Sequence, residues 1–314
     1  MSENNGTYKK VIIIGSGPAG LTAGLYAARA NLNPLVLEGT QPGGQLTITT
    51  DVENYPGFPD GILGPELMDK MRQQASKFGA ECKYETVSEV NFSERPFKVK
   101  TEKSEYAGDT VIISTGASAL FLDVPGEEKY MGRGVSACAT CDGFFFSNQE
   151  IVVVGGGDTA MEEATYLTKF AKKVHIVHRR DELRASKTMQ DRARKNEKIE
   201  FIFDTVIDEI VGDDDAVNGV KLRNVKSGEV SDFPIEGVFM AIGHTPNTSI
   251  FKGKLDMDNV GYLKVKNGST RTNIEGIFAA GDVADHVYRQ AVTAAGTGCM
   301  AAIDAERWLE DQAN

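Results

Sequence analysis

The sequence has few of the residues and segments that mark secreted or membrane proteins. It contains only four cysteines in 314 residues, which is too few for a disulfide-stabilised secreted domain. The polar segment 1–10 and the apolar run Val11–Ile14 that follows it are shorter than a signal peptide's apolar region or a spanning helix of about 20 residues. No apolar run long enough for either segment occurs elsewhere in the chain. We therefore expect a cytoplasmic protein.

Basic residues are outnumbered by acidic ones, and the formal net charge is −11. A surface that binds nucleic acid needs clustered basic side chains, so this balance argues against a nucleic-acid partner. Most of the acidic excess is expected to be solvated surface. The content of hydrophobic residues, 41%, is ordinary for a globular protein. A chain of this length can form two domains, each with its own core.

The chain contains one internal repeat. Its first copy is an apolar run at Val11–Ile14, a glycine-rich turn at 15–20, a helical stretch to about Ala30, and a second apolar run at 34–37 that ends at Glu38. Short, β-branched, wholly apolar runs are typical of strands buried in a parallel sheet. The repeat therefore begins as a strand–helix–strand unit.

The second copy has the same elements in the same order. An apolar run at Ile151–Val154 leads into the turn 155–160, a helical stretch to about Ala171 and a second run at 174–177 that ends at His178. The first glycines of the two turns, Gly15 and Gly155, are 140 residues apart, and so are Glu38 and His178. The sequence therefore predicts two similar domains.

Each copy matches the βαβ fingerprint of a dinucleotide-binding domain. The first glycine permits a tight turn, the second lets the backbone approach a pyrophosphate, and a third small residue lets the helix pack against the strand. The pyrophosphate then lies at the helix N-terminus, where N–H groups and the helix dipole favour negative charge. One such motif is weak evidence, but two with matching flanking elements are strong. The predicted contacts are Gly15, Ser16, Gly17, Pro18, Ala19 and Gly20 in the first copy, and Gly155, Gly156, Gly157, Asp158, Thr159 and Ala160 in the second.

Each half continues with a short antiparallel β-meander and a closing apolar strand. The meander strands are expected at 87–92 and 97–101 in the first half and at 206–211 and 217–225 in the second, and the closing strands are 111–116 and 237–243. These patterns predict an α/β protein with two Rossmann-like three-layer nucleotide-binding domains, each with a small β-meander.

The residue that ends the second strand of each copy distinguishes the two nucleotides. Glu38 is acidic, so it can accept hydrogen bonds from ribose hydroxyls and would repel a 2′-phosphate. The second copy has His178, Arg179 and Arg180 at this position, with Arg184 one turn later. Arginine binds phosphate bidentately, although a basic run can also be ordinary solvated surface. We expect FAD or NAD(H) in the first site and NADPH in the second.

A third apolar strand near the C-terminus, 276–282, ends in Gly281-Asp282. It indicates that the first domain resumes after the second, which is therefore an insertion. The expected boundaries are 1–116 with 248–314 for an FAD-binding domain and 117–247 for an NADPH-binding domain. Two nucleotide sites in one redox enzyme most economically hold FAD and NADPH. Asp282 would then hold the ribityl chain of the flavin, although the same residue could be a helix N-cap.

Cys138 and Cys141 form a C-x-x-C motif in the second domain, whereas Cys82 and Cys299 lie in apolar surroundings and are expected in the core. Such a motif is either a redox-active pair or half of a zinc site. Zinc needs two more soft or imidazole ligands nearby. The sequence has no second C-x-x-C, and its four histidines lack finger-like spacing. We therefore favour a redox-active pair.

Taken together, these motifs resemble those of the low-molecular-weight bacterial thioredoxin reductases along the whole chain. The matching segments are 15–20, 43–46, 53–57, 138–143, 155–160, 178–180, 281–283 and 289–291. The extra N-terminal dithiol domain of alkyl hydroperoxide reductase flavoproteins is not expected here.

The resemblance implies a homodimer with FAD and NADPH as cofactors and thioredoxin as the protein substrate. It implies that Cys141 faces the flavin, that Cys138 attacks thioredoxin, and that Asp142 is the acid and base at this pair. It also implies a docking surface of Arg133, Phe144 and Phe145, although an apolar run such as 144–146 is more often core. It extends the predicted FAD contacts to Gly43, Gly44, Gln45, Leu46, Asn54, Thr115, Gly116, Gly281, Asp282, Arg289, Gln290 and Ala291, and the NADPH contacts to Ile242 and Gly243.

Other functions remain open at this point. The chain could be a related flavin disulfide reductase or dithiol oxidase acting on a low-molecular-weight thiol or disulfide, or a non-enzymatic flavin redox sensor. A ferredoxin–NADP reductase of related fold would lack the C-x-x-C motif. The dithiol and the NADPH site belong to one domain and the flavin to the other, so the sequence also predicts a rotation of the NADPH domain about hinges near 117–120 and 244–247.

Overall fold

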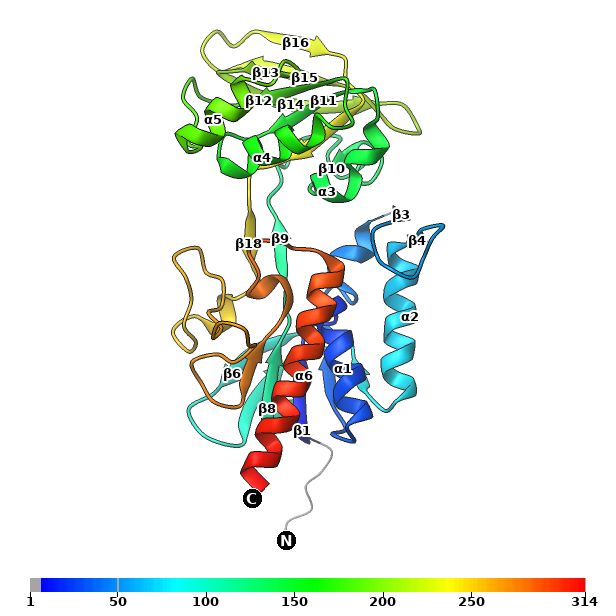
Figure 1. Cartoon of the computed structure of the whole chain (residues 1–314), viewed down its shortest axis with the longest axis vertical. Helices are drawn as coiled ribbons and strands as arrows, with labels where there is room; N and C mark the ends of the chain where they lie inside the picture. Colours follow the sequence, from blue (N-terminus) through cyan, green and yellow to red (C-terminus); the bar gives the residue numbers. More distant parts are fainter. Residues whose placement is uncertain (1–6, 50, 314) are drawn as a thin grey trace. The chain divides into compact units, whose positions relative to one another are not determined.

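The computed structural model describes residues 7–49 and 51–313, so most of the polar N-terminal segment lies outside the described residues. The chain divides into two compact units (Figure 1). Unit 1 comprises Met1–Ser118 and Thr245–Asn314, and unit 2 comprises Ala119–His244. Which nucleotide each unit binds remains a prediction.

Unit 1 is built on a parallel sheet whose central strand is β1. The order β5-β2-β1-β8, with β19 on the far side of β8, is that of a Rossmann-like fold. The consecutive residues Val11, Ile12 and Ile13 of β1 are all fully buried, because both faces of the sheet are covered. The bounds are β1 Tyr8–Ile14, β2 Leu35–Leu37, β5 Glu81–Lys83, β8 Glu105–Ile113 and β19 Ile277–Ala279.

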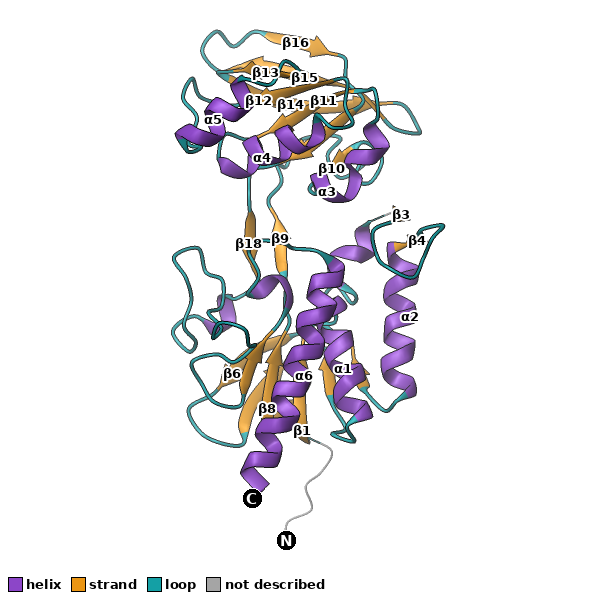
Figure 2. Cartoon of the chain, viewed as in Figure 1, coloured by secondary structure: helices purple, strands orange, loops and turns teal. Residues whose placement is uncertain are grey.

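Three helices accompany this sheet (Figure 2): α1 (Pro18–Arg29), α2 (Gly64–Lys77) and α6 (Ala291–Ala313). α1 and α6 share one apolar core with the sheet. Their approach is so close that a Cβ on Gly298 would lie 2.1 Å from the Ala19 carbonyl oxygen. Glycine at this point of α6 is therefore a packing requirement, because any side chain would collide with the backbone of α1.

The β-meander of unit 1 joins the main sheet instead of forming a separate layer. β6 (Val87–Asn91) pairs antiparallel with β7 (Phe97–Thr101), and β7 pairs antiparallel with the first half of β8. The second half of β8 pairs with the parallel strand β19. β8 has nine residues. This length lets it belong to both the antiparallel meander and the parallel sheet.

Unit 2 is a three-layer domain on a five-stranded parallel sheet of order β10-β17-β11-β12-β13. α4 (Asp158–Leu167) and α5 (Lys187–Arg194) cover one face, and the antiparallel sheet β14-β15-β16 covers the other. Alternate residues of β11 belong to different cores, Ile151 and Val153 to the helical side and Val152 and Val154 to the other. The bounds are β10 Val135–Ser136, β11 Glu150–Val154, β12 Lys173–Val177, β13 Ile199–Ile202, β14 Thr205–Gly212, β15 Val217–Asn224, β16 Val230–Phe233 and β17 Gly237–Met240. The α/β prediction is confirmed.

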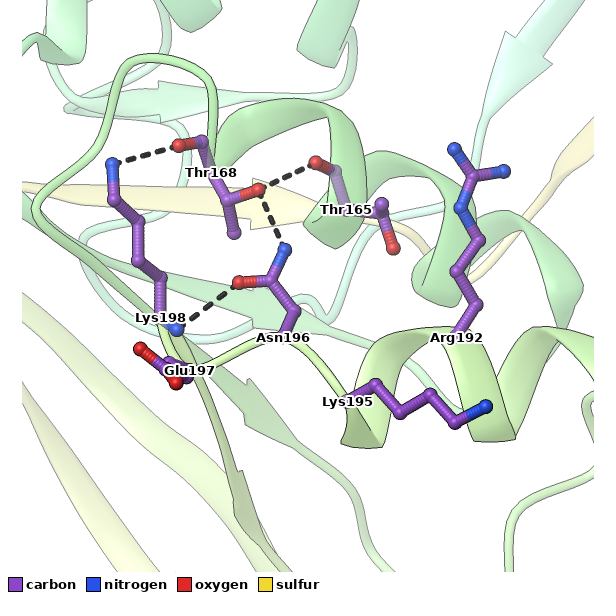
Figure 3. A pocket seen from close by; sticks show the side chains of 7 residues that line it. All are labelled: Thr165, Thr168, Arg192, Lys195, Asn196, Glu197 and Lys198. Carbon is purple, nitrogen blue, oxygen red and sulfur yellow. Dashed lines mark hydrogen bonds between the residues drawn. The ribbon is translucent and has the colours of Figure 1, made fainter.

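One predicted helix end is wrong. α4 ends at Leu167, whereas the sequence suggested a helix to about Ala171. Lys198 Nζ donates to the Thr168 carbonyl oxygen at 2.9 Å, and Asn196 donates to the Thr168 hydroxyl at 3.0 Å (Figure 3). Lys198 Nζ also donates to the Ala171 carbonyl oxygen at 2.9 Å. Lys198 thus satisfies carbonyls at the end of the helix, where a cation is also favoured by the helix dipole.

The chain passes between the units twice. β9 (Ala117–Ala119) and β18 (His244–Pro246) mark these crossings and pair as a two-stranded sheet. Within residues 7–49 and 51–313, no helix is long and apolar enough to cross a membrane.

Candidate functional site

The first glycine-rich turn connects β1 to α1 and has the geometry that its sequence predicts. Gly15 has φ +106°, and a Cβ there would lie 2.3 Å from the Ser114 carbonyl oxygen. A Cβ on Gly20 would lie 2.0 Å from the Gly15 carbonyl oxygen, whereas a Cβ on Gly17 would meet nothing within 4 Å. Gly17 is the N-cap of α1 and no side chain caps this helix. The backbone at the helix N-terminus is therefore open to an anionic group, as pyrophosphate binding requires.

Glu38 lies directly after β2 and is buried, with 3% of its surface exposed. The Ser16 hydroxyl donates to the Glu38 carbonyl oxygen at 3.2 Å and accepts from the Gly43 N–H at 3.0 Å. Ser16 thus joins the glycine-rich turn to Glu38, the predicted ribose contact, and to the segment that contains Gly43. Gly43 adopts φ +87°, a conformation that favours glycine.

The other predicted FAD contacts of unit 1 lie around this turn. Gln45 and Leu46 belong to the 3-10 helix η1 (Gly44–Ile48), and a Cβ on Gly44 would lie 3.5 Å from the Gly17 Cα. Asn54 donates to the Gln290 side chain at 3.3 Å across 236 residues of sequence. Two further predicted contacts lie shortly after β8, Thr115 and Gly116, and a third, Ala291, begins α6. The fold therefore brings together segments that are distant in the sequence.

Asp282 lies in the 3-10 helix η4 (Gly281–Val283), directly after β19. Its Oδ1 is buried and has no hydrogen-bond partner. Burial, followed by the nearby Asp285 charge, raises the pKa of Asp282 to about 6, although Arg289 acts in the opposite direction. Asp282 is not a helix N-cap here, because Ala280 is the N-cap of η4 and Asp282 lies inside this helix.

A buried acceptor without a partner needs a donor. The hydroxyl groups of a flavin's ribityl chain are such donors, and the open turn at Gly17 suits its pyrophosphate. The residues of unit 1 therefore fit FAD.

The second glycine-rich turn repeats the geometry of the first. A Cβ on Gly155 would lie 2.4 Å from the Ala241 carbonyl oxygen, and a Cβ on Gly157 would meet nothing within 4 Å. Ala160 is fully buried against the sheet. Asp158 accepts from the Ser186 N–H at 2.7 Å, which ties the start of α4 to the loop after β12. Ile242 and Gly243 follow Ala241, so they lie at the same end of the sheet.

The basic cluster after β12 contains one buried and three exposed residues. Arg179, Arg180 and Arg184 are exposed, and in the described part of the chain none of their guanidinium groups forms an ion pair. The Arg184 N–H donates to the Gly156 carbonyl oxygen at 2.7 Å, which places this residue beside the turn. Exposed guanidinium groups next to a glycine-rich turn can bind a phosphate.

His178 differs from its arginine neighbours. Its ring is buried, its Nε2 lies 3.1 Å from the Glu182 carbonyl oxygen, and a Cβ on Gly156 would lie 2.3 Å from the ring. Burial is the main cause that lowers its pKa, and the three arginines act in the same direction. A neutral, enclosed imidazole shapes the turn, so we assign the charge of this site to the arginines.

The two cysteines of the C-x-x-C motif form a disulfide in unit 2. Cys138 is the N-cap of the short helix α3 (Ala139–Asp142), and the 3-10 helix η2 (Gly143–Phe146) follows at once. Both cysteines are partly exposed, so burial alone does not distinguish their roles. Among the residues that the structure describes, no cluster of three or more His, Cys, Asp or Glu could hold a metal ion.

Asp142 is the acidic group next to the disulfide. Burial raises its pKa, and a hydrogen bond with Ser136 lowers it in part. The Ser136 hydroxyl also accepts from the Cys138 N–H at 3.0 Å. A carboxyl group with a raised pKa can hold a proton nearer to neutral pH, which suits an acid and base beside a thiol.

The three consecutive phenylalanines after the disulfide have two different environments. Phe146 is buried and packs edge-on against Phe239, with ring centroids 5.1 Å apart. Phe144 and Phe145 are 63% and 44% exposed. The core interpretation of this run is therefore right for Phe146 only. Arg133 is exposed as well, although its guanidinium donates to the carbonyl oxygens of Lys129 and Asp214.

The open hollow drawn in Figure 3 lies elsewhere in unit 2. It contains none of the predicted contacts, being lined by Thr165, Thr168, Arg192, Lys195, Asn196, Glu197 and Lys198.

The chain is similar to known proteins along most of its length. The sequence profile of the pyridine nucleotide-disulphide oxidoreductases matches residues 9–298. The chain belongs to this family. It is 59% identical to a thioredoxin reductase of Rickettsia conorii over 303 residues, covering 96% of this chain and 98% of the relative. It is 58% identical to a thioredoxin reductase of Mycolicibacterium smegmatis, covering 98% of both chains.

Solved structures give the same result. The thioredoxin reductase of Streptococcus pyogenes superimposes with a TM-score of 0.93 at 49% identity, covering 97% of this chain and 99% of the other. The chain is therefore a flavin-dependent disulfide oxidoreductase of the bacterial thioredoxin reductase type, and its cofactors are FAD and NADPH.

Sequence reasoning missed several residues of these sites. Ser136 and Arg72 contact predicted site residues through side chains, and Gly298 permits the contact between α1 and α6. A serine two residues before a C-x-x-C motif was an available signal. Arg72 had none, because it contacts Glu38 across 34 residues of sequence.

Proposed function

We propose that this protein uses NADPH to reduce the disulfide of thioredoxin. The observation that supports this most strongly is the disulfide Cys138–Cys141, which lies beside the half-buried acid Asp142 and is followed by the exposed rings of Phe144 and Phe145. Its relatives carry the name thioredoxin reductase. Exposed aromatic side chains next to a redox centre favour a protein partner over a low-molecular-weight disulfide, because large rings dominate protein interfaces.

The residues of this chain have separate tasks in the reaction. Arg179, Arg180 and Arg184 bind the 2′-phosphate that distinguishes NADPH, and Glu38 binds the adenosine ribose of FAD. FAD, when bound, passes the electron pair of the NADPH hydride to a disulfide. The Cys138–Cys141 bond is then broken, and Asp142 supplies a proton to one of the sulfurs.

The dithiol reduces the partner by thiol–disulfide exchange. The Cys138 thiolate attacks one sulfur of the thioredoxin disulfide, which forms a mixed disulfide and releases the other thioredoxin sulfur as a thiol. Cys141, as the thiolate, attacks the Cys138 sulfur and breaks the mixed disulfide. The second thioredoxin sulfur leaves and takes up a proton, and the Cys138–Cys141 disulfide is restored. One NADPH and one proton are consumed for each disulfide reduced. The separate roles of the two cysteines rest on the family resemblance.

Two further features belong to this proposal. We assign a homodimer, which is supported by exposed apolar side chains on neighbouring helices of unit 1, Tyr26 on α1 and Val292 and Met300 on α6. We assign a cytoplasmic location, where NADPH is available and thiols are kept reduced.

The test is an assay of the purified, yellow protein with NADPH and thioredoxin. We expect rapid NADPH oxidation with one thioredoxin dithiol formed per NADPH. Cys138→Ser and Cys141→Ser variants should lose this activity, yet NADPH should still bleach their flavin under anaerobic conditions. Faster turnover with a low-molecular-weight disulfide than with thioredoxin would favour a different disulfide reductase, and NADPH oxidation with oxygen alone would favour an oxidase.

A further inference from the structure

The ribose-binding carboxylate of unit 1 is held by a second residue. Arg72 on α2 donates from Nε to Glu38 Oε1 at 2.9 Å and from Nη2 to Oε2 at 3.2 Å. The Glu38 side chain is 1% exposed and that of Arg72 is 32% exposed. A bidentate pair of this kind is strong and sets the orientation of the carboxylate as well as its charge.

The backbone around this pair is also fixed. The Glu38 N–H donates to the Lys83 carbonyl oxygen at 2.9 Å, and the Ser16 hydroxyl donates to the Glu38 carbonyl oxygen. On the other side, the Arg72 guanidinium lies over the Tyr84 ring, 5.0 Å from its centroid. Arg72 therefore connects α2 and the strand end after β5 to the carboxylate.

The Glu38 carboxylate has enough acceptor sites for both Arg72 and two ribose hydroxyls. A carboxylate has about four lone-pair sites. Arg72 uses one on each oxygen, which leaves about one on each for a ribose hydroxyl. Without Arg72, Glu38 would be a buried charge without its partner, and such a carboxylate is costly to keep ionised. The pair thus holds the Glu38 carboxylate oriented before any nucleotide binds.

We infer that Arg72 is a positioning residue for FAD. It holds Glu38 so that the carboxylate accepts hydrogen bonds from the 2′- and 3′-hydroxyls of the adenosine ribose. This inference rests on the assignment of FAD to unit 1 in the proposed function. The pair Arg72–Glu38 differs from an ordinary surface ion pair on the same helix. The pair Lys70–Glu66 provides that comparison, because its N–O distance is 3.2 Å but both side chains are 53% exposed.

The experiment measures FAD release from the full-length holoenzyme by dilution and recovery of free-flavin fluorescence. Arg72→Ala should weaken FAD binding at least about tenfold, because removing one partner of a buried ion pair leaves the other uncompensated. Arg72→Lys keeps the charge but not the bidentate contact, so its loss should be smaller. Lys70→Ala, the matched control, should release FAD as the wild type does.

A ligand lacking one hydroxyl separates positioning from general stability. The wild type should bind FAD more tightly than the analogue whose adenosine ribose lacks the 2′-hydroxyl, and Arg72→Ala should lose most of this preference. An Arg72→Ala variant that keeps the full preference would overturn the inference, even if its melting temperature falls. Arg72→Lys provides the same comparison if Arg72→Ala does not fold.

The variant Glu38→Gln separates the inference about Arg72 from the assignment of FAD to unit 1. Both hold if Glu38→Gln and Arg72→Ala each weaken FAD binding. If Glu38→Gln weakens FAD binding and Arg72→Ala does not, the inference about Arg72 is wrong and the proposed function stands. If Glu38→Gln leaves FAD binding unchanged, the placement of FAD in unit 1 is wrong.

Discussion

At the scale of single residues, the ionised side chain of Asp282 lowers the stability of the folded chain. Its pKa is raised from 3.8 to about 6, mainly by burial. The folded chain therefore binds this proton more tightly than the unfolded chain, and this group's contribution to stability falls as pH rises from about 4 to about 6. Above that window the buried carboxylate destabilises the flavin-free protein by up to about 3 kcal/mol.

The prediction is that Asp282→Asn stabilises the flavin-free protein and weakens FAD binding. The free energy of unfolding, measured with urea, should exceed that of the wild type by about 1–3 kcal/mol at pH 7–8, and the difference should vanish near pH 4. FAD release should be faster from the variant at pH 7–8, where Asp282 is charged, because the amide does not accept hydrogen bonds as strongly as a charged carboxylate does. A variant less stable than the wild type at pH 8 would contradict this account.

The arginines of unit 2 give a second prediction at this scale. Replacing Arg179 and Arg180 together by Ala should raise KM for NADPH by about a hundredfold or more and leave KM for NADH nearly unchanged. Each lost hydrogen bond to a phosphate costs about 1.5–3 kcal/mol, and NADH has no 2′-phosphate. Arg223→Ala is the control, because Arg223 pairs with Asp208 in the β14-β15 sheet. Equal losses with both nucleotides would exclude a role in phosphate recognition.

At the scale of secondary-structure elements, the segment after the disulfide combines an anchor with a contact surface. Phe146 is held in the core by Phe239. Phe144 is exposed, but its ring lies edge-on to those of Phe145 and Phe170, with centroids 6.4 and 6.1 Å apart. η2 thus presents two oriented rings beside the disulfide without needing support from a partner.

Phe144→Ala and Phe145→Ala should therefore each raise KM for thioredoxin by about tenfold, since burying one such ring at an interface contributes about 1.5–3 kcal/mol. Activity with a small aromatic disulfide should change little, because that substrate needs the dithiol alone. Val230→Ala, at a 52% exposed position of unit 2, should leave both activities unchanged. Parallel losses with both substrates would mean that the rings support the disulfide and do not bind thioredoxin.

How much of the fold and of the candidate site could be predicted depends on how far apart in the sequence the interacting residues lie. β1, β11 and the turns after them were predictable, because buried strands and tight turns impose local patterns on the sequence. The end of α4 was not, because it depends on Asn196 and Lys198, which lie about 30 residues away. The burial of His178 and the pairing of Arg72 with Glu38 were hidden for the same reason. Each is decided by tertiary contacts that leave no periodic signal.

At the scale of the whole molecule, the chain order sets a requirement on motion. The disulfide and the second glycine-rich turn both belong to unit 2, whereas the first turn and Asp282 belong to unit 1. NADPH and the disulfide must each reach the flavin in turn, and the dithiol must then meet a protein partner. One fixed arrangement of two rigid units can hardly meet all three demands, and only two chain crossings, at β9 and β18, connect the units.

We therefore predict that unit 2 rotates relative to unit 1 during each catalytic cycle, on the microsecond-to-millisecond timescale of domain motions. Fluorophores at the exposed positions Lys98 in unit 1 and Glu229 in unit 2 allow the distance between the units to be followed in single molecules. Two populations should exchange, and their ratio should shift when NADP⁺ is added, because the nucleotide stabilises the state in which it lies against the flavin. Labels at Lys98 and Lys77, both in unit 1, should give one constant distance. A single unchanging distance between the units of an enzyme that still turns over thioredoxin would refute the rotation.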